Sequence, residues 1–132
     1  MSRPSLSGSR PAALLIIAGV EGIEALALVA LAALAIAAGP GSAYPLTAYG
    51  VGGTLLIAAA LLVAVAVGTL RARPWSRTAG FVWQIVQVLV GLYALQGEGA
   101  QPGIAVAAIL PAALVLVLLF TGPVRDATSR PS

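Results

Sequence analysis

Residues 12–38 form an unbroken run of 27 residues that contains no Pro and only two charged side chains. As an α-helix this run would measure about 40 Å, more than the roughly 30 Å hydrocarbon core of a bilayer. The whole chain has 132 residues, of which 60% are hydrophobic and only 8% are charged. A soluble domain of this size carries about three times that share of charge. We therefore expect an all-α, polytopic integral membrane protein.

Gly- and Pro-rich breaks divide the chain into four apolar segments. We predict one domain over residues 1–132, a bundle of four transmembrane helices at residues 12–38, 51–70, 79–95 and 103–121. The tails, residues 1–10 and 123–132, are rich in Ser, Pro and Arg and are predicted to be disordered. Pro111 should kink the fourth segment and leave the carbonyl of Ala107 without its helical donor.

The arginines indicate the orientation of these segments. All basic residues are Arg, and they flank the segments on one predicted side: Arg3, Arg10, Arg71, Arg73, Arg77, Arg125 and Arg130. The other two connections carry no basic residue. The positive-inside rule then predicts a multi-pass protein of the plasma (inner) membrane with both termini and the 71–77 loop in the cytoplasm.

Aromatic residues agree with this topology. Four of them fall near predicted interfaces, where amphipathic rings prefer to lie: Tyr44, Tyr49 and Tyr93 outside and Trp75 inside. The other three, Phe81, Trp83 and Phe120, are expected to be ordinary apolar filling.

A second interpretation of the first segment is a cleaved signal peptide. Arg3 and Arg10 give a basic start, and Ala35-Ile36-Ala37 resembles a cleavage site. The segment is, however, longer than the usual signal core of about 7–15 apolar residues, and its two glutamates are unusual there. We favour a retained span.

Two carboxylates lie inside the first segment. Glu21 and Glu24 are three residues apart, so they fall about 60° apart on one helix face, about 15 Å and 19 Å from Pro11. A charged residue near the centre of a span costs about 2.5–3.5 kcal/mol. We therefore expect both side chains to face protein or water and to be at least partly protonated.

The third segment offers a partner for these carboxylates. Gln84 and Gln87 have the same spacing, at a similar depth, on a face that includes Gly80 and Gly91. Small residues allow another helix to approach, and amides supply donors and acceptors. We predict a buried polar network of Glu21, Glu24, Gln84 and Gln87 between two parallel helices.

Two interpretations of this network remain open. It can have a structural role, in which hydrogen bonds between the helices fix their register. It can also be an intramembrane site for a proton or cation, since neighbouring carboxylates can share one proton. A ridge of small residues in the second segment, Ala60, Ala64 and Gly68, also suits close helix contact, although an Ala-rich span forms such ridges by chance.

The residue inventory removes most enzyme chemistry. The sequence has no Cys and no His, so thiolate or histidine metal sites, disulfides, His-ligated haem and the common nucleophile–base pairs cannot form. We expect no enzyme, no cofactor and no metal. Binding of nucleic acid is also not expected, because the arginines flank apolar segments instead of lining a basic groove.

The loop Arg71-Ala72-Arg73-Pro74-Trp75-Ser76-Arg77, with Trp83-Gln84 and Leu95-Gln96-Gly97, resembles a family of uncharacterised small four-span membrane proteins common in actinobacteria. The resemblance covers mostly residues 68–122 and implies the topology but no activity. The chain is also similar to small multidrug resistance transporters in length, span number and a glutamate in the first span. It differs from them in its strong arginine asymmetry and in lacking their aromatic-rich motif around Trp83.

These features favour a structural or accessory component of a membrane assembly, surrounded by lipid and bound to a larger membrane protein or to further copies of itself. The alternative is a small oligomeric proton-coupled transporter or channel that uses Glu21 and Glu24.

Overall fold

The computed structural model describes residues 11–129, and this part of the chain contains helices and turns but no β-strand. In chain order the elements are α1 (Ala12–Ala38), the short 3-10 helix η2 (Gly39–Gly41), α2 (Pro45–Leu70), α3 (Pro74–Tyr93), α4 (Pro102–Leu119) and α5 (Gly122–Ser129). The predicted all-α fold is confirmed. Residues 1–10 and 130–132, which hold most of the predicted disordered tails, lie outside the described residues.

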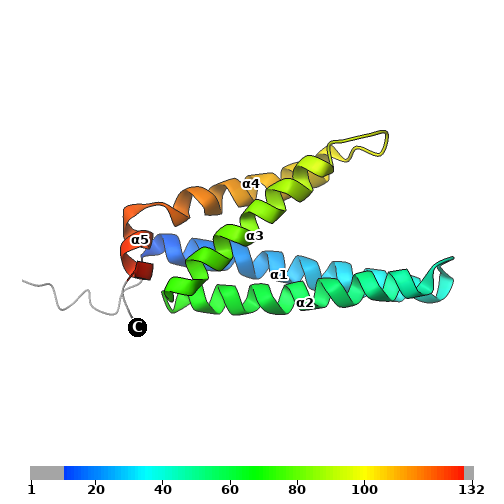
Figure 1. The fold of residues 1–132 in the computed structure, drawn as a ribbon, viewed down its shortest axis with the longest axis horizontal. Coiled ribbons are helices and arrows are strands. Elements are labelled where there is room, and N and C mark those ends of the chain that lie inside the picture. Colours follow the sequence, from blue (N-terminus) through cyan, green and yellow to red (C-terminus); the bar gives the residue numbers. More distant parts are fainter. Residues whose placement is uncertain (1–10, 130–132) are drawn as a thin grey trace, which may run out of the picture.

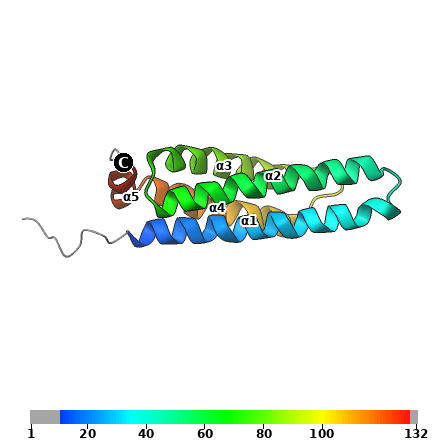
Figure 2. The same cartoon turned by 90° about the horizontal axis from the view of Figure 1, so that it is seen from below.

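The four long helices form two antiparallel hairpins (Figure 1). α1 packs against α2 along its length, and α3 packs against α4. The second hairpin crosses the first near the start of α1 and diverges from it toward the turn between α3 and α4 (Figure 1). Seen from below, the axes of all four helices are roughly aligned, and the chain direction alternates within each hairpin (Figure 2).

The apolar core lies where the hairpins cross. One cluster joins α1, α4 and α5 and consists of Leu14, Ile17, Val115, Leu119 and Val124. A second cluster consists of Ala25, Leu62 and Val65 from α1 and α2, with Ala79 and Trp83 of α3 packed against it. Most of the other large apolar side chains of the described helices point outward. Such an apolar exterior is what a lipid environment requires.

Three of the described helical segments are long and apolar enough to cross a membrane: Ala12–Gly41, Pro45–Leu70 and Pro102–Leu119. This finding supports a helical membrane protein with several spans. α3 has 20 residues, but Arg77, Gln84 and Gln87 make it less apolar than the other three. The fourth span therefore stays a prediction.

Most predicted boundaries lie close to those of the helices. The first predicted span coincides with α1, whereas α2 begins at Pro45, six residues before the predicted start at residue 51. Proline suits the first turn of a helix, and α3 and α4 likewise begin at prolines. The glycines that follow Pro45 do not break α2, because Gly52 packs closely on α1: a Cβ there would lie 3.2 Å from the Ala32 carbonyl oxygen. α4 continues through Pro111.

The C-terminal segment differs from the prediction of disorder over residues 123–132. Its described part belongs to α5, Gly122–Ser129. Val124 and Thr128, four residues apart and therefore on one face, are both buried, and Val124 packs with Leu14 and Leu119. The helix is thus held by tertiary contacts that the composition of the segment does not reveal.

Gly91 marks a close approach of α3 and α4. A Cβ at this position would lie 2.5 Å from Ile109 Cγ1 and 3.3 Å from the Ala105 carbonyl oxygen. We predict that Gly91→Ala lowers the free energy of unfolding in detergent by about 1–3 kcal/mol, because the helices must separate or Ile109 must leave its rotamer. The matched control is Gly53→Ala in α2, where nothing lies within 4 Å. Titration with dodecyl sulfate followed by circular dichroism measures both, and equal stability of the variants would contradict the close contact.

Candidate functional site

Glu21 is completely buried on the face of α1 that meets α2 and α3. Its Oε1 lies 2.9 Å from the hydroxyl of Thr69 on α2, and the same hydroxyl lies 2.9 Å from the carbonyl oxygen of Val65. A hydroxyl has a single hydrogen to donate. Both contacts are full hydrogen bonds only when Thr69 donates to Val65 and a protonated Glu21 donates to Thr69. The arrangement therefore suits a neutral carboxylic acid at residue 21.

Glu24, one turn further along α1, is half-buried and accepts hydrogen bonds on both of its oxygens. The indole Nε1 of Trp83 donates to Oε2 at 2.8 Å, and the amide Nε2 of Gln84 donates to Oε1 at 3.3 Å. Both donors lie on α3, so this carboxyl group links the first hairpin to the second.

We call Glu21, Glu24, Thr69, Trp83 and Gln84 the polar cluster. Its members come from α1, α2 and α3, and it lies against the apolar cluster of Ala25, Leu62 and Val65. Transfer of a polar group out of water costs several kcal/mol of free energy unless the group is hydrogen-bonded, and the hydrocarbon core of a bilayer contains no water that could replace a lost partner. The polar cluster therefore holds the two hairpins at one relative position.

Two buried atoms of the polar cluster lack a hydrogen-bond partner among the described residues: Glu21 Oε2 and Gln84 Oε1. Both are acceptors, so the cluster has more acceptors than donors. Gly80 leaves the space in which Glu21 Oε2 lies, since a Cβ at residue 80 would be 3.0 Å from it. A proton on Glu21 Oε1 that is donated to Thr69 satisfies neither of these two atoms.

The structure places the predicted network differently from the sequence-based hypothesis in one respect. Glu24 and Gln84 are in contact, and Glu21 lies beside Gly80. Gln87, however, points away from α1 and toward α4, its partner within the second hairpin. Its amide donates a hydrogen bond of 2.8 Å to the Ala108 carbonyl. This carbonyl follows that of Ala107, the group expected to lose its donor to Pro111. Gln87 thus stabilises α4 near its proline instead of joining Glu21.

Two members of the polar cluster were not predicted. Trp83 was expected to be apolar filling, but its indole N–H is a donor to Glu24. Trp83 lies three residues after Gly80 and four before Gln87, and this helical spacing is the signal that could have placed it on their side of α3. Thr69 lies one residue before the end of the second predicted span, whereas Glu21 lies about 15 Å into the first, so depth counted along the sequence could not have paired them.

The predicted packing residues have different roles. Gly80 and Gly91 allow close approach, Gly80 beside Glu21 and Gly91 beside α4. Gly68 is buried against Trp75 and Ser76, where a Cβ would lie 2.7 Å from the indole ring. Ala60 and Ala64 are exposed, so the predicted ridge is not a contact between helices of the described chain. They face the surroundings of the protein.

Comparison with protein-family models, with curated proteins and with solved structures gives no significant match. The resemblance to small four-span membrane proteins of actinobacteria stays a prediction. Within residues 11–129 no group of three or more His, Cys, Asp or Glu side chains is close enough to hold a metal ion.

The contribution of the Trp83 bond can be measured. Trp83→Phe removes the N–H and leaves Glu24 Oε2 without a donor, so we predict a loss of about 1–3 kcal/mol in the free energy of unfolding. Trp75→Phe is the control, because the Trp75 ring is 51% exposed and its N–H has no partner within the described part of the chain. Denaturation in detergent followed by circular dichroism compares the two, and a Trp83→Phe protein as stable as the control would show that the bond contributes nothing.

Proposed function

We propose that the protein is a small integral membrane protein with a structural or accessory role in a membrane assembly. Glu21 and Gln84 are fully buried, and every hydrogen bond of the polar cluster is made within the chain itself. The burial of Glu21 and Gln84, together with the hydrogen bonds that join Glu24 to α3, is the observation that carries the proposal. The surfaces left for other molecules are the apolar outer faces of the helices, including Ala60 and Ala64, which suit lipid and the helices of a partner.

We further propose four spans in the plasma (inner) membrane, with both termini in the cytoplasm. Arg71, Arg73, Arg77 and Arg125 belong to the segments at the end of the molecule where α2 ends, α3 begins and α5 lies (Figure 1). The turns at the other end, residues 39–44 and 94–101, carry no basic residue. This asymmetry supports the orientation through the positive-inside rule.

Labelling of single cysteines tests this topology, and the natural sequence contains no Cys that would interfere. For four spans we predict that Ala43→Cys and Gly99→Cys react with a membrane-impermeant maleimide in intact cells, whereas Ser129→Cys reacts only after permeabilisation. If α3 does not cross, residue 99 moves to the protected side and residue 129 to the accessible side. That pattern would contradict the four spans. Protection of residues 43 and 99 with free labelling of residue 129 would contradict the orientation.

A second candidate function is proton-coupled transport through Glu21 and Glu24. The specific observation in its favour is the Thr69 hydroxyl, whose two acceptors fit a protonated Glu21, together with the buried Glu21 Oε2 that has no donor within residues 11–129. A carboxyl group in a span that holds a proton is one requirement of a proton carrier.

Glutamine substitutions separate the two functions. For the accessory role we predict that Glu21→Gln and Glu24→Gln remain folded and that wild type and both variants co-purify equally with a larger membrane protein at a fixed stoichiometry. An amide can replace a neutral acid in hydrogen bonding but cannot release a proton. Affinity purification from native membranes in mild detergent, followed by mass spectrometry, measures the stoichiometry.

The opposite result has a distinct signature. Recovery of the chain only with copies of itself, together with proton-coupled flux in liposomes that both glutamine variants abolish while staying folded, would replace the accessory role with the transporter. Glu21→Leu is the reference for loss of the hydrogen bonds, because leucine has neither donor nor acceptor.

A further inference from the structure

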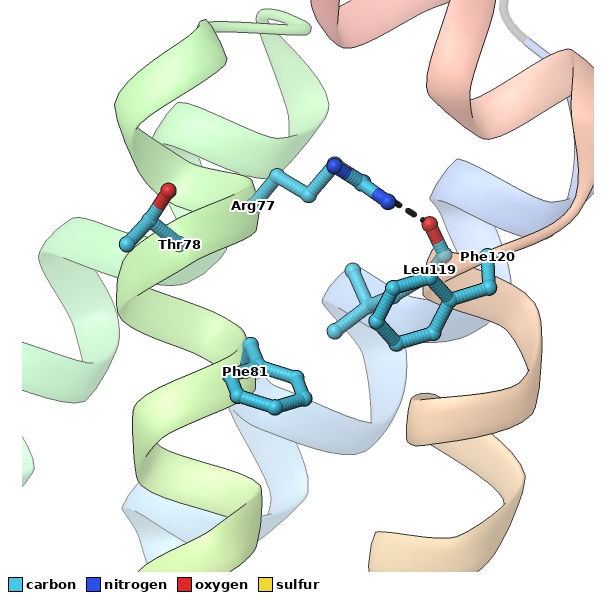
Figure 3. Close-up of a pocket in the computed structure, with 5 residues that line it drawn as sticks. All are labelled: Arg77, Thr78, Phe81, Leu119 and Phe120. Atoms are coloured by element: carbon cyan, nitrogen blue, oxygen red, sulfur yellow. Dashed lines mark hydrogen bonds between the residues drawn. The ribbon is translucent and has the colours of Figure 1, made fainter.

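Arg77 is held in a defined position where α3 begins and α4 ends (Figure 3). Its Nε donates a hydrogen bond of 2.9 Å to the carbonyl oxygen of Leu119, the last residue of α4. The guanidinium carbon lies 5.0 Å from the centroid of the Phe120 ring, within the range of a cation–π contact. Phe120 in turn meets Phe81 edge to face, with 5.8 Å between ring centroids. The guanidinium group is thus positioned by two neighbours, Leu119 and Phe120, and Phe81 supports the Phe120 ring.

This cation has no counter-charge within the described residues. No carboxylate of residues 11–129 forms an ion pair with Arg77, and its side-chain hydrogen bond uses Nε alone. Capping of the α4 C-terminus accounts for that bond. The two Nη groups carry four further N–H donors in a planar fork that matches the oxygens of a carboxylate or a phosphate. The donors that cap α4 and the donors open to a ligand are therefore different atoms of one side chain.

The fork borders a pocket of about 170 Å³ lined by Arg77, Thr78, Phe81, Leu119 and Phe120. The guanidinium group forms the polar side of the pocket, and the Phe81, Leu119 and Phe120 side chains form its apolar side (Figure 3). Phe81 and Phe120 are 38% and 56% exposed, so the apolar side opens toward the surroundings of the helices. It lies at the terminus of α4, one of the helices apolar enough to span a membrane, which is the depth at which lipid phosphates occur.

We propose that this pocket binds the phosphate of an anionic phospholipid. The Nη groups donate to the phosphate oxygens, and the first acyl carbons lie along Phe81 and Phe120. The inference is independent of the proposed accessory role and of the orientation of the chain, because phosphates occur in both leaflets.

Native mass spectrometry of the full chain in detergent tests the site. The protein is offered equal amounts of phosphatidylglycerol and phosphatidylcholine, and the ratio of the two bound lipids is measured. We predict that wild type prefers phosphatidylglycerol and that Arg77→Gln lowers this preference about tenfold, the effect of losing one charge-assisted hydrogen-bond pair. Arg71→Gln is the matched control: it removes the same charge from an exposed side chain outside the pocket and should change the preference less than about twofold.

Arg77→Lys keeps the charge and gives a second test if the glutamine variant does not fold. An ammonium group keeps the charge but lacks the planar fork that can donate two parallel hydrogen bonds to a phosphate, so the preference should fall about threefold. Equal preference in wild type and Arg77→Lys, or equal losses in Arg77→Gln and Arg71→Gln, would overturn the site. Inorganic phosphate in large excess should leave the lipid bound, and displacement by it would overturn the assignment to a lipid.

Discussion

The hydrogen bonds to Glu21 and Glu24 are the interactions on which the arrangement of the helices depends. α1 is otherwise apolar, so these two carboxyl groups are its main obstacle to lying in lipid. Thr69 of α2 and the Trp83–Gln84 pair of α3 remove that obstacle from two sides. The two buried carboxyl groups of α1 thus determine that its neighbours must supply hydrogen-bonding side chains.

The same bonds explain why the hairpins meet at one end and separate at the other. In lipid, apolar helix faces gain no hydrophobic free energy from touching each other, because acyl chains are as apolar as leucine. Contact between the hairpins is therefore favoured only where polar side chains or well-packed small residues supply it. The polar cluster and Gly80 lie at the crossing, whereas beyond it Gln87 and Gly91 turn to α4, and α3 leaves α1 (Figure 1).

Features that depend on residues close together in the sequence could be predicted, whereas contacts that depend on how the helices cross could not. Long apolar runs predict helices directly, and the matched depth of the Glu and Gln pairs predicts that α1 and α3 approach each other. The individual bonds depend on the crossing angle, which rotates Gln87 away from Glu21 and brings in Trp83. α5 was missed because only two of its eight residues, Val124 and Thr128, are buried, and composition does not show which surface receives them.

The polar cluster also accounts for the weakest feature of the predicted topology, the low hydropathy of α3. Burying the polar groups of Trp83 and Gln84 in lipid would be unfavourable if α3 were alone. In the structure both donate hydrogen bonds to Glu24, whose burial would be unfavourable if α1 were alone. The two helices are complementary, so the free energy of burying either one has meaning only when the other is present. A helix that fails a hydropathy criterion can be stable in a membrane when its polar face is satisfied by another span, because the relevant transfer is that of the assembled pair. Arg77 and Thr78 lie in the first turns of α3, outside this pairing, and in the proposed topology they fall at the interface, where charge is compatible with the surroundings.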